Sequence, residues 1–357
     1  MRLFLISNMY PDVNSPGYGV FVKNVADYLD ENGMKISYHA VIKGRSKNAI
    51  HKIVKYITFY FKIMCHYFKA YDAIYLHYPN MAIPILFPLF KIHNKKLIVN
   101  YHGEDLLYSG QIGTILGKLT EKFVKKYADI VVVPSNFFKQ ELLKRSICTE
   151  DKIIVFPSGG INPKVFYPST KNKENNILQI GFVGRIEYGK GWKEYILALN
   201  KLKDVVDFRG YIIGYGTLEP QMHNLISQCN LNSRIDLIKG ISQDELRNYY
   251  NLFDVLLFTS QLPESLGLVG LEAMACGTPI IATNIGGIST YTINNVNGFL
   301  VDKGDITGIV HSVERYINLD YKEKLQMMNK CIETAKKYST ETIYIAFLES
   351  IKKHLNS

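Results

Sequence analysis

The hydrophobic residues of this chain form short, nearly continuous runs separated by amphipathic segments. Arg2–Asn8, Lys96–Tyr101 and Ile177–Val183 are such runs, and each has the length of one strand. Continuous apolar runs are typical of strands covered on both faces, as in a parallel sheet. Segments with helical spacing, such as Val20–Leu29, lie between the runs. The alternation of the two patterns predicts an α/β fold.

The same pattern gives further elements along the whole chain. Strands are expected over Ala73–Tyr78, Asp129–Pro134, Ile153–Pro157, Val206–Gly214, Ile235–Gly240, Asp254–Ser260 and Pro279–Ala282. Helices are expected over His51–Tyr71, Glu121–Ala128, Ser135–Leu143, Gln243–Leu252, Leu266–Ala275 and Glu341–His354. Both halves therefore consist of successive βα units.

The length of the chain suits two domains. It has 357 residues, of which 47% are hydrophobic, and this is enough for two full cores. The polar segment Ser169–Asn176 interrupts the regular pattern and is interpreted as a linker. We therefore expect one domain over residues 1–168, a second over 177–337, and a terminal helical segment over 338–357.

Positive charge is concentrated in the first half of the chain. Residues 1–165 contain 22 Lys and Arg against 12 Asp and Glu, whereas residues 166–357 contain 20 of each. The whole excess of +10 therefore lies in the first half. It indicates an anionic partner for that half: a membrane, a lipid phosphate or a nucleic acid.

The segment His51–Tyr71 is a basic and aromatic helix candidate. Lys55, Lys62 and Lys69 repeat every seven residues and share one face, and apolar side chains cover much of the rest. Such a helix suits the surface of an anionic membrane. The alternative is a packed helix whose lysines form its solvent face.

The sequence disfavours several other classes of protein. The five cysteines are far apart without C-x-x-C spacing, so neither a zinc site nor a disulfide framework is indicated, and reduced thiols suit a cytoplasmic protein. Met1–Ile6 is interpreted as a strand, being too short for a signal peptide, and no stretch reaches the roughly eighteen apolar residues of a membrane span. The chain has no Asp-x-Asp triplet, so no metal is expected on a diphosphate.

Two loops of the first half follow strands and carry candidate binding residues. Gly17-Tyr18-Gly19 precedes a helix, where a ligand can approach backbone N–H groups, although a plain turn remains the alternative. Val22 stands where a dinucleotide fingerprint has its third glycine, which disfavours a dehydrogenase. His102-Gly103-Glu104-Asp105 follows a strand at the edge where open α/β sheets bind ligands. The alternative for His102 is a purely structural role.

Two cations follow the first strand of the second half. Ile177–Val183 leads into Gly184-Arg185, and Lys190-Gly191 comes five residues later. An arginine fork and a lysine point charge above the end of a strand suit a diphosphate. Taken singly, each is equally compatible with an ordinary surface cation.

The stretch Pro263–Thr283 combines a strand–loop–helix–strand unit with two acids. Glu264 lies at the helix entrance, and Glu272 lies eight residues later, roughly on the same side of the helix expected from Leu266. Carboxylates accept hydrogen bonds from sugar hydroxyls. The alternative is that both acids are simply solvated.

Small residues lie between these two acids. Ser265, Gly267 and Gly270 leave the first turns of the helix free of bulk. The unpaired N–H groups at a helix N-terminus attract anions, and small side chains let a phosphate come close. Phosphate donors beside hydroxyl acceptors suit a nucleotide-sugar.

The string from Pro263 to Thr283 resembles the glutamate–seven–glutamate signature of family-4-type retaining glycosyltransferases (group 1) of the GT-B fold. The segments His102–Asp105 and Ser158–Pro168 and the pair Arg185 and Lys190 also resemble that family. The likeness covers nearly the whole chain and is strongest over 178–300. Asn162 departs from it, because the family usually has Asp there, so no contact is carried over to that position.

The resemblance implies two Rossmann-like domains facing across a cleft, with the last helix returning to the first domain. It implies that Arg185 and Lys190 bind the donor diphosphate, that Glu264 contacts the donor sugar and that Glu272 binds the ribose. It places His102 at the sugar and Asp105 near it. The implied catalytic set is His102, Arg185, Lys190 and Glu264. The implied binding set is Gly17, Gly19, Gly184, Arg185, Lys190, Ile241, Glu264, Ser265, Leu266, Gly267, Leu268 and Glu272.

The implied activity is transfer of a hexosyl or N-acetylhexosaminyl group, with retention and without a metal or other cofactor. The donor is a nucleotide diphosphate sugar, with UDP favoured, and the acceptor is a hydroxyl of a lipid-linked or cell-envelope glycan. Together with the charge, this places the protein on the inner face of the cytoplasmic membrane as a peripheral protein without a nucleic-acid partner. The alternatives are a non-catalytic GT-B protein that binds nucleotide-sugar or serves as a scaffold, and a nucleotide-sugar epimerase.

Overall fold

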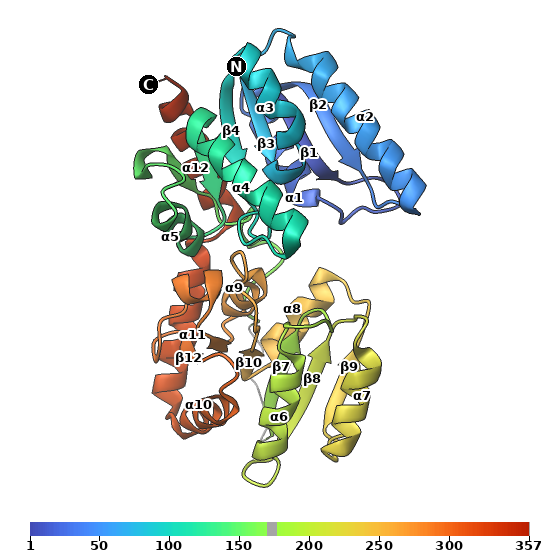
Figure 1. The fold of residues 1–357 in the computed structure, drawn as a ribbon. Coiled ribbons are helices and arrows are strands. Elements are labelled where there is room, and N and C mark those ends of the chain that lie inside the picture. Colours follow the sequence, from blue (N-terminus) through green and yellow to red (C-terminus); the bar gives the residue numbers. More distant parts are fainter. Residues whose placement is uncertain (170–176, 357) are drawn as a thin grey trace. The chain divides into compact units, whose positions relative to one another are not determined.

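A computed structural model describes residues 1–169 and 177–356 of the chain. The fold divides into two compact units (Figure 1). The first unit comprises Met1–Gly159 and Ile343–Ser357, and the second comprises Gly160–Thr342. The linker expected over Ser169–Asn176 lies, apart from its first residue, outside the described residues.

The first unit is built on a six-stranded sheet in the order β2-β1-β3-β4-β5-β6. All neighbouring strands are parallel. The strands are β1 (Arg2–Tyr10), β2 (Lys35–Lys43), β3 (Ala73–His77), β4 (Lys96–Asn100), β5 (Ile130–Val133) and β6 (Ile153–Val155). The apolar runs of β1, β3, β4, β5 and β6 are largely buried, as the sequence pattern predicts. Strand β2 is not among the predicted strands and is buried only at Ala40, Val41 and Ile42.

The helices of the first unit cover both faces of this sheet. They are α1 (Val20–Glu31), α2 (Ala49–Tyr67), α3 (Ile83–Ile92), α4 (Gly110–Tyr127), α5 (Asn136–Lys144) and most of α12 (Thr340–Asn356), with the short turns η1 (Pro79–Met81) and η2 (Glu150–Lys152). One core includes residues of α2, α3 and α4, and the other includes residues of α1 and α12. Both sheet faces are therefore covered, which is the requirement of an all-parallel sheet.

Helix α4 is longer than the sequence pattern predicts, because it begins at Gly110 rather than at Glu121. Its first turns contain Gly113 and Gly117, which weaken the helical pattern. A Cβ at Gly117 would lie 2.0 Å from the ring of Tyr108. The glycine therefore makes room for a packed aromatic ring, a tertiary reason that a local pattern does not reveal.

The second unit contains another six-stranded parallel sheet, in the order β12-β11-β10-β7-β8-β9. Its strands are β7 (Leu178–Val183), β8 (Phe208–Ile213), β9 (Ile235–Ile238), β10 (Val255–Phe258), β11 (Ile280–Thr283) and β12 (Gly298–Val301). Its helices are α6 (Trp192–Leu202), α7 (Glu219–Gln228), α8 (Gln243–Leu252), α9 (Leu268–Ala275), α10 (Ile306–Asn318) and α11 (Tyr321–Lys336), with the 3₁₀ turn η3 (Gly286–Thr290). The α/β fold with parallel sheets is thus confirmed in both halves.

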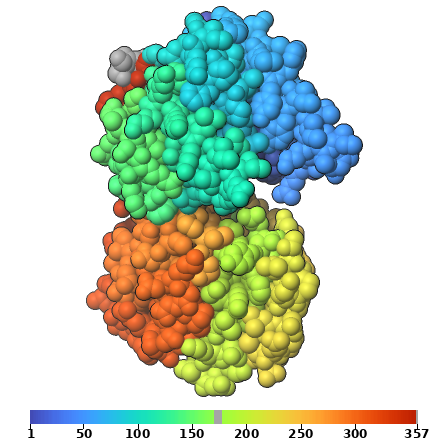
Figure 2. Space-filling model, viewed as in Figure 1, coloured from blue at the N-terminus to red at the C-terminus, as the bar shows by residue number. Residues whose placement is uncertain are grey.

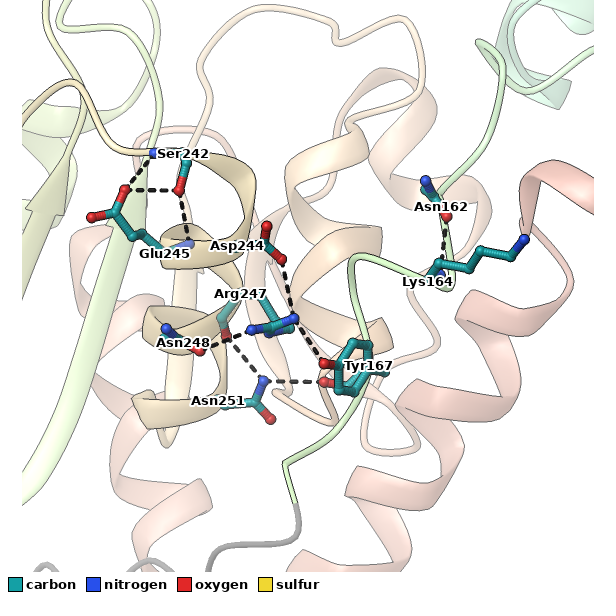
Figure 3. Close-up of polar contacts among 9 residues, drawn as sticks. All are labelled: Asn162, Lys164, Tyr167, Ser242, Asp244, Glu245, Arg247, Asn248 and Asn251. Carbon is teal, nitrogen blue, oxygen red and sulfur yellow. Dashed lines mark hydrogen bonds and ion pairs between the residues drawn. The ribbon is translucent and has the colours of Figure 1, made fainter.

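The segment 160–168 belongs to the second unit, so the boundary lies near Gly159 rather than at residue 168. The Arg247 guanidinium of α8 lies over the Tyr167 ring, 4.7 Å from its centroid, and donates to the Tyr167 hydroxyl at 2.9 Å. Asn251 of the same helix donates to the Tyr167 carbonyl at 3.1 Å (Figure 3). The Oδ1 atom of Asn162 accepts from the backbone N–H of Lys164 at 3.0 Å. These bonds fix the segment to the second unit before the polar stretch begins.

Candidate functional site

The first candidate group lies where β7 ends in the second unit. Gly184 and the exposed Arg185 follow the strand directly. The loop after β8 approaches so closely that a Cβ at Gly214 would lie 1.9 Å from the Gly184 carbonyl oxygen. The backbones of the two loops therefore meet at the carboxyl edge of the sheet with no side chain between them. This edge is where ligands bind in open α/β sheets.

Lys190 and Glu264 are brought together from positions 74 residues apart. The Lys190 ammonium lies 2.8 Å from Oε1 of Glu264, and only about a fifth of each side chain is exposed (22% and 20%). The hydroxyl of Ser260, just after β10, donates to the same Oε1 at 2.9 Å. Glu264 is thus held in one position by a cation and a hydroxyl, and Lys190 is held in the loop after β7 that also contains Arg185.

The backbone around Lys190 is equally fixed. Gly191 has φ +87° and stands at the N-terminus of α6. A Cβ there would lie 2.1 Å from the carbonyl oxygen of Thr259, so the loop passes directly over the end of β10. The glycine therefore places Lys190 where it reaches the Glu264 carboxylate.

The expected helix around the acid pair begins later than the sequence predicts. It starts at Leu268 rather than near Leu266, with Gly267 at its N-cap in a left-handed conformation (φ +86°). Glu264 therefore lies in the preceding loop, and helical spacing from Glu264 to Glu272 does not apply. The loop is held in a non-helical path by the left-handed backbone of Gly267 and by the bonds from Ser260 and Lys190 to Glu264.

Glu272 lies on α9 and is half-buried. Its Oε2 accepts a hydrogen bond from the Tyr250 hydroxyl of α8 at 2.9 Å. Burial raises the pKa of the Glu272 carboxyl to about 7, against the opposing effect of the Tyr250 bond. A carboxyl whose pKa is raised to near neutrality by burial is a candidate functional residue, because strongly shifted pKa values are concentrated at functional sites.

The small residues of this unit serve packing as well as access. A Cβ at Gly270 would lie 2.4 Å from the Tyr291 hydroxyl, and one at Gly267 would lie 2.9 Å from side chains of Ile288 and Phe258. The Tyr291 hydroxyl donates to the Gly267 carbonyl at 2.8 Å. The expectation that Gly270 leaves space for a phosphate is therefore wrong, because aromatic side chains already occupy that space. Ser265, Leu266, Gly267 and Leu268 remain predicted phosphate-side residues.

The turn after β11 supports the Glu264 loop. The Gly287 N–H donates to the Glu264 carbonyl at 2.8 Å. A Cβ at Gly286 would lie 2.7 Å from the Glu264 nitrogen. The paired glycines thus let two backbone segments touch and fix the position of Glu264.

Ile241, the residue expected near the nucleotide base, follows β9. It is half-buried and lies directly before the α8 cap, Ser242. Gly240 has φ +64°, and Lys239 forms an ion pair with Glu219. The loop is therefore held at the same carboxyl edge of the sheet as the cations after β7.

The two glycines expected at the acceptor side of the first unit differ in role. Gly19 has φ +71° at the N-cap of α1, and a Cβ there would lie 2.6 Å from the carbonyl carbon of Met9. Gly17 has open space around it, with no atom within 4 Å of an added Cβ. Only Gly19 is required by the fold, because it brings α1 against the end of β1.

His102 lies just after β4 in a cluster of rings. Its imidazole stacks on Tyr78 at 4.4 Å between centroids and contacts Phe21 of α1 at 4.8 Å. Its Nε2 lies 3.0 Å from Nδ1 of His77 at the end of β3. Burial lowers the pKa of His102 to about 3, so the ring is neutral at physiological pH.

The Asp105 side chain binds the backbone of the turn that contains His102. Its carboxylate accepts from the backbone N–H of His102 at 2.9 Å and from that of Gly103 at 2.9 Å. Burial raises the pKa of Asp105 to about 7, although these bonds act in the opposite direction. The carboxylate is therefore directed at the loop that carries His102.

Two family models match the chain in succession. The model for glycosyltransferase family 4 matches residues 17–160, and the model for glycosyl transferases group 1 matches residues 166–338. The chain belongs to the family-4-type glycosyltransferases of group 1. The family expected from Pro263–Thr283 is therefore confirmed.

Individual proteins show how far the similarity extends. An uncharacterized glycosyltransferase of Methanocaldococcus jannaschii is 26% identical over 96% of this chain and 95% of its own. A capsular polysaccharide biosynthesis glycosyltransferase, CapM of Staphylococcus aureus, is 30% identical over 56% of this chain and 55% of its own. Anabaena HepE, whose crystal structure is a complex with UDP-glucose, has a TM-score of 0.74, 17% identity, and coverage of 99% and 100%. The fold of this glycosyltransferase is GT-B.

Sequence analysis missed several residues that position the predicted site of this glycosyltransferase. Ser260 and Tyr250 hold the two acids, and His77 contacts His102. In the sequence, the double glycine Gly286-Gly287 is the signal for the close approach of its turn to Glu264. The other partners are ordinary residues whose role depends on tertiary contacts.

Proposed function

We propose that this glycosyltransferase moves a hexosyl or N-acetylhexosaminyl group from a nucleotide diphosphate sugar to a hydroxyl, with retention. The observation that carries the proposal is the Lys190–Glu264 contact, formed by the same loop after β7 that contains Arg185. This contact places a cation that suits a phosphate next to a carboxylate that suits sugar hydroxyls. Family membership supports the reaction class.

The leaving diphosphate gains negative charge as the bond to the sugar breaks. Lys190 and Arg185 stabilise that charge, and a cation held in place needs no reorganisation at the moment of reaction. Glu264 fixes Lys190 and accepts from hydroxyls of the donor sugar. The backbone N–H groups over Ser265–Leu268 add to the positive environment of the phosphates.

The remaining predicted residues bind or position substrates in this proposal. Glu272 accepts hydrogen bonds from the ribose hydroxyls, and the Ile241 loop lies at the base. In the first unit, His102 acts as a neutral hydrogen-bonding group toward sugar, and Gly19 gives an acceptor access to the start of α1. Asp105 is a positioning residue for the His102 turn, because its carboxylate binds backbone N–H groups there.

The choice of substrates rests on relatives and on charge. UDP is the favoured nucleotide because the HepE structure contains UDP-glucose. A lipid-linked or cell-envelope glycan is the favoured acceptor because CapM is named for capsular polysaccharide biosynthesis. The excess positive charge of residues 1–165 supports peripheral association with an anionic membrane from the cytoplasmic side. Within the described residues no helix has both the length and the apolar character needed to cross a bilayer.

A donor screen tests the proposal. Ligand binding to the folded state raises the unfolding temperature, so UDP-, GDP- and ADP-sugars are compared by thermal shift. We expect a UDP-sugar to give the largest shift, and slow release of UDP from that donor in the absence of acceptor. Binding of a nucleotide-sugar without hydrolysis or transfer favours a non-catalytic protein. An altered sugar that is still attached to UDP favours an epimerase. If no nucleotide-sugar raises the unfolding temperature, the proposal is contradicted.

A further inference from the structure

Helix α2 packs on the first sheet through only one of its faces. Phe59, Ile63 and Tyr67 are buried in the same core as residues of β1, β2 and β3, and Tyr56 and Tyr60 pack against it. This face packs the helix against the sheet. A surface helix with one core face ordinarily carries polar residues on the opposite side.

The opposite side of α2 is apolar as well. The residues there are Ile50, Ile53, Val54, Ile57, Phe61, Met64 and, at the C-cap, Phe68, and we call them the apolar row. Their exposed fractions run from 45% for Met64 to 75% for Ile50. Successive members are three or four residues apart, except for neighbours Ile53 and Val54, so they form one stripe along the helix.

The apolar row is open along the edge of the first unit. In Figure 1 helix α2 runs along the outer margin of that unit, and in Figure 2 the blue part of the chain lies at the same margin. The described residues leave all seven side chains exposed. Scattered apolar residues are normal on a surface, but a contiguous stripe marks an interaction surface. The apolar row is therefore a candidate surface for a partner.

The charge beside the row selects among possible partners. From Gly44 to Tyr71 the chain contains six Lys and Arg and no Asp or Glu. Lys62 and Lys69 are exposed along one flank of the row. A second copy packed row against row would bring two such helices together with no acid to pair them. An anionic surface complements the same charges.

Lys55 is not part of this surface, which corrects the stripe expected from the sequence. Its ammonium donates to the carbonyls of Lys43, Gly44 and Arg45 at 2.5, 3.0 and 3.2 Å. It therefore ties α2 to the end of β2. Of the three expected lysines, Lys62 and Lys69 remain available to an external anion.

We infer that the apolar row of α2 inserts into the interfacial region of an anionic lipid bilayer, with Lys62 and Lys69 at the headgroups. This inference rests on the proposed function, because it supplies the surface by which the transferase reaches a membrane-bound acceptor. A helix of 19 residues is about 28 Å long and lies in the plane of the membrane. Amphipathic helices of this kind bury their apolar side about 5–10 Å deep.

Apolar insertion and charge attraction predict different salt behaviour. Attraction between exposed charges is screened over about 8 Å at physiological ionic strength. Burial of Ile57 and Phe61 in the acyl region is not screened. Binding through the apolar row should therefore weaken with salt but persist at high salt, whereas a purely electrostatic contact would vanish.

Vesicle flotation of the full chain tests the inference. The probes are phosphatidylcholine vesicles with and without phosphatidylglycerol, and the variant is Ile57→Ser with Phe61→Ser. Its matched control is Val205→Ser with Ile293→Ser, two side chains of the second unit that are 62% and 57% exposed. We expect the wild type and the control to float with anionic vesicles, and the α2 variant to lose roughly tenfold or more of its partitioning.

Two further measurements separate the possible failures. The indole introduced by a Phe61→Trp substitution should be quenched by brominated lipids in anionic vesicles. The thermal shift with UDP should be the same in the α2 variant as in wild type, since neither changed residue is in the predicted donor site. Wild-type partitioning of the Ile57→Ser, Phe61→Ser variant, or no quenching of the introduced indole while vesicles are bound, would overturn the inference. The inference would also be overturned if the wild type binds no vesicles but forms a dimer that the α2 variant does not form, and the row would then be assigned to a second copy. Failure of the wild type to bind UDP would instead contradict the proposed function.

Discussion

At the scale of single residues, the predicted donor site is built by bonds between distant positions. Lys190 meets Glu264, and Ser260 fixes the same carboxylate. Tyr250 fixes Glu272. Each charged side chain is therefore held before a substrate arrives, and preorganised charge is the property on which electrostatic catalysis depends.

Removing either cation should affect turnover more than folding. Lys190→Ala and Arg185→Ala should each reduce kcat by about 100-fold or more, the scale of losing one preorganised donor. The control is Lys193→Ala, an exposed lysine on the same stretch of chain. Turnover is followed by UDP release with donor and acceptor. Rates near wild type in both variants, with the control also unchanged, would remove these residues from the proposed mechanism.

Glu272 should give nucleotide binding a pH dependence. The carboxyl has a pKa of about 7 in the fold. In the proposed role its ionised form accepts hydrogen bonds from the ribose hydroxyls. UDP affinity should therefore rise as pH increases through about 7, and Glu272→Gln should lack this step. Isothermal titration between pH 6 and pH 8, that is about one unit on either side of the pKa, measures it.

The same carboxyl has an effect on stability with a defined sign. Its ordinary pKa is 4.5, and burial raises it to about 7 in the folded state. The folded protein thus holds this proton more tightly, and the group lowers stability progressively as pH rises from 4.5 to about 7. Glu272→Gln should remove that part of the decline, and an unchanged pH profile of unfolding in the variant would contradict the assignment.

His77 should set the state of His102. The two rings share a hydrogen bond of 3.0 Å, and within the described residues Nε2 of His77 is buried without a hydrogen-bond partner. His77→Phe should change the ¹⁵N tautomer signals of His102 and lower kcat about tenfold, a modest effect for a positioning group. UDP binding should not change, and His77→Asn should restore part of kcat. Unaltered His102 signals in His77→Phe would show that His77 has only a packing role.

At the scale of elements, glycine turns determine where the charged side chains lie. Gly191 and Gly33 offer a matched comparison, because their φ values are +87° and +88°. An added Cβ meets the Thr259 carbonyl at 2.1 Å in the first case and nothing within 4 Å in the second. Gly191→Ala should therefore lose about 2 kcal/mol more stability than Gly33→Ala, the usual scale of overpacking. It should also weaken UDP binding, and denaturant unfolding together with titration measures both effects; equal losses in the two variants would show that the contact with Thr259 is unimportant.

The sequence predicts elements well where one local pattern determines them. Most of the parallel strands are predicted because they are continuous apolar runs, but β2, which is only partly buried, and the four-residue β12 are not. The cations Arg185 and Lys190 are predicted because they lie in the loop after such a run. The start of α9 was wrong because loop contacts of Glu264 override helical spacing. The apolar all-round pattern of α2 was visible, but only tertiary packing distinguishes its core face from its exposed row.

At the scale of the whole molecule, the two units differ in charge and in predicted task. The second unit carries the phosphate-side and ribose-side candidates, and the first carries the positive excess, the His102 cluster and the apolar row. A transferase that draws a soluble donor to a membrane-bound acceptor needs both properties. In the proposed function the second unit binds the donor and the first unit reaches the acceptor.

Activity should not depend on an added metal ion. Within the described ranges no group of three or more His, Cys, Asp and Glu could hold one. In the proposed mechanism Lys190 and Arg185 supply the positive charge for the diphosphate. We expect the rate of UDP release to be the same with and without EDTA. Loss of activity in EDTA that Mg²⁺ or Mn²⁺ restores would show that a metal shares the role assigned to the cations.

The central claim is transfer of a sugar from a nucleotide diphosphate sugar to an envelope glycan or its lipid-linked precursor. The most direct measurement incubates the full chain with a UDP-sugar and an envelope lipid extract, and follows UDP release and product mass together. The account predicts an acceptor heavier by one sugar residue, formed in the same amount as UDP, and loss of both signals in Lys190→Ala. A folded wild-type protein that binds no nucleotide-sugar, or that forms the product equally well without Lys190, would contradict it.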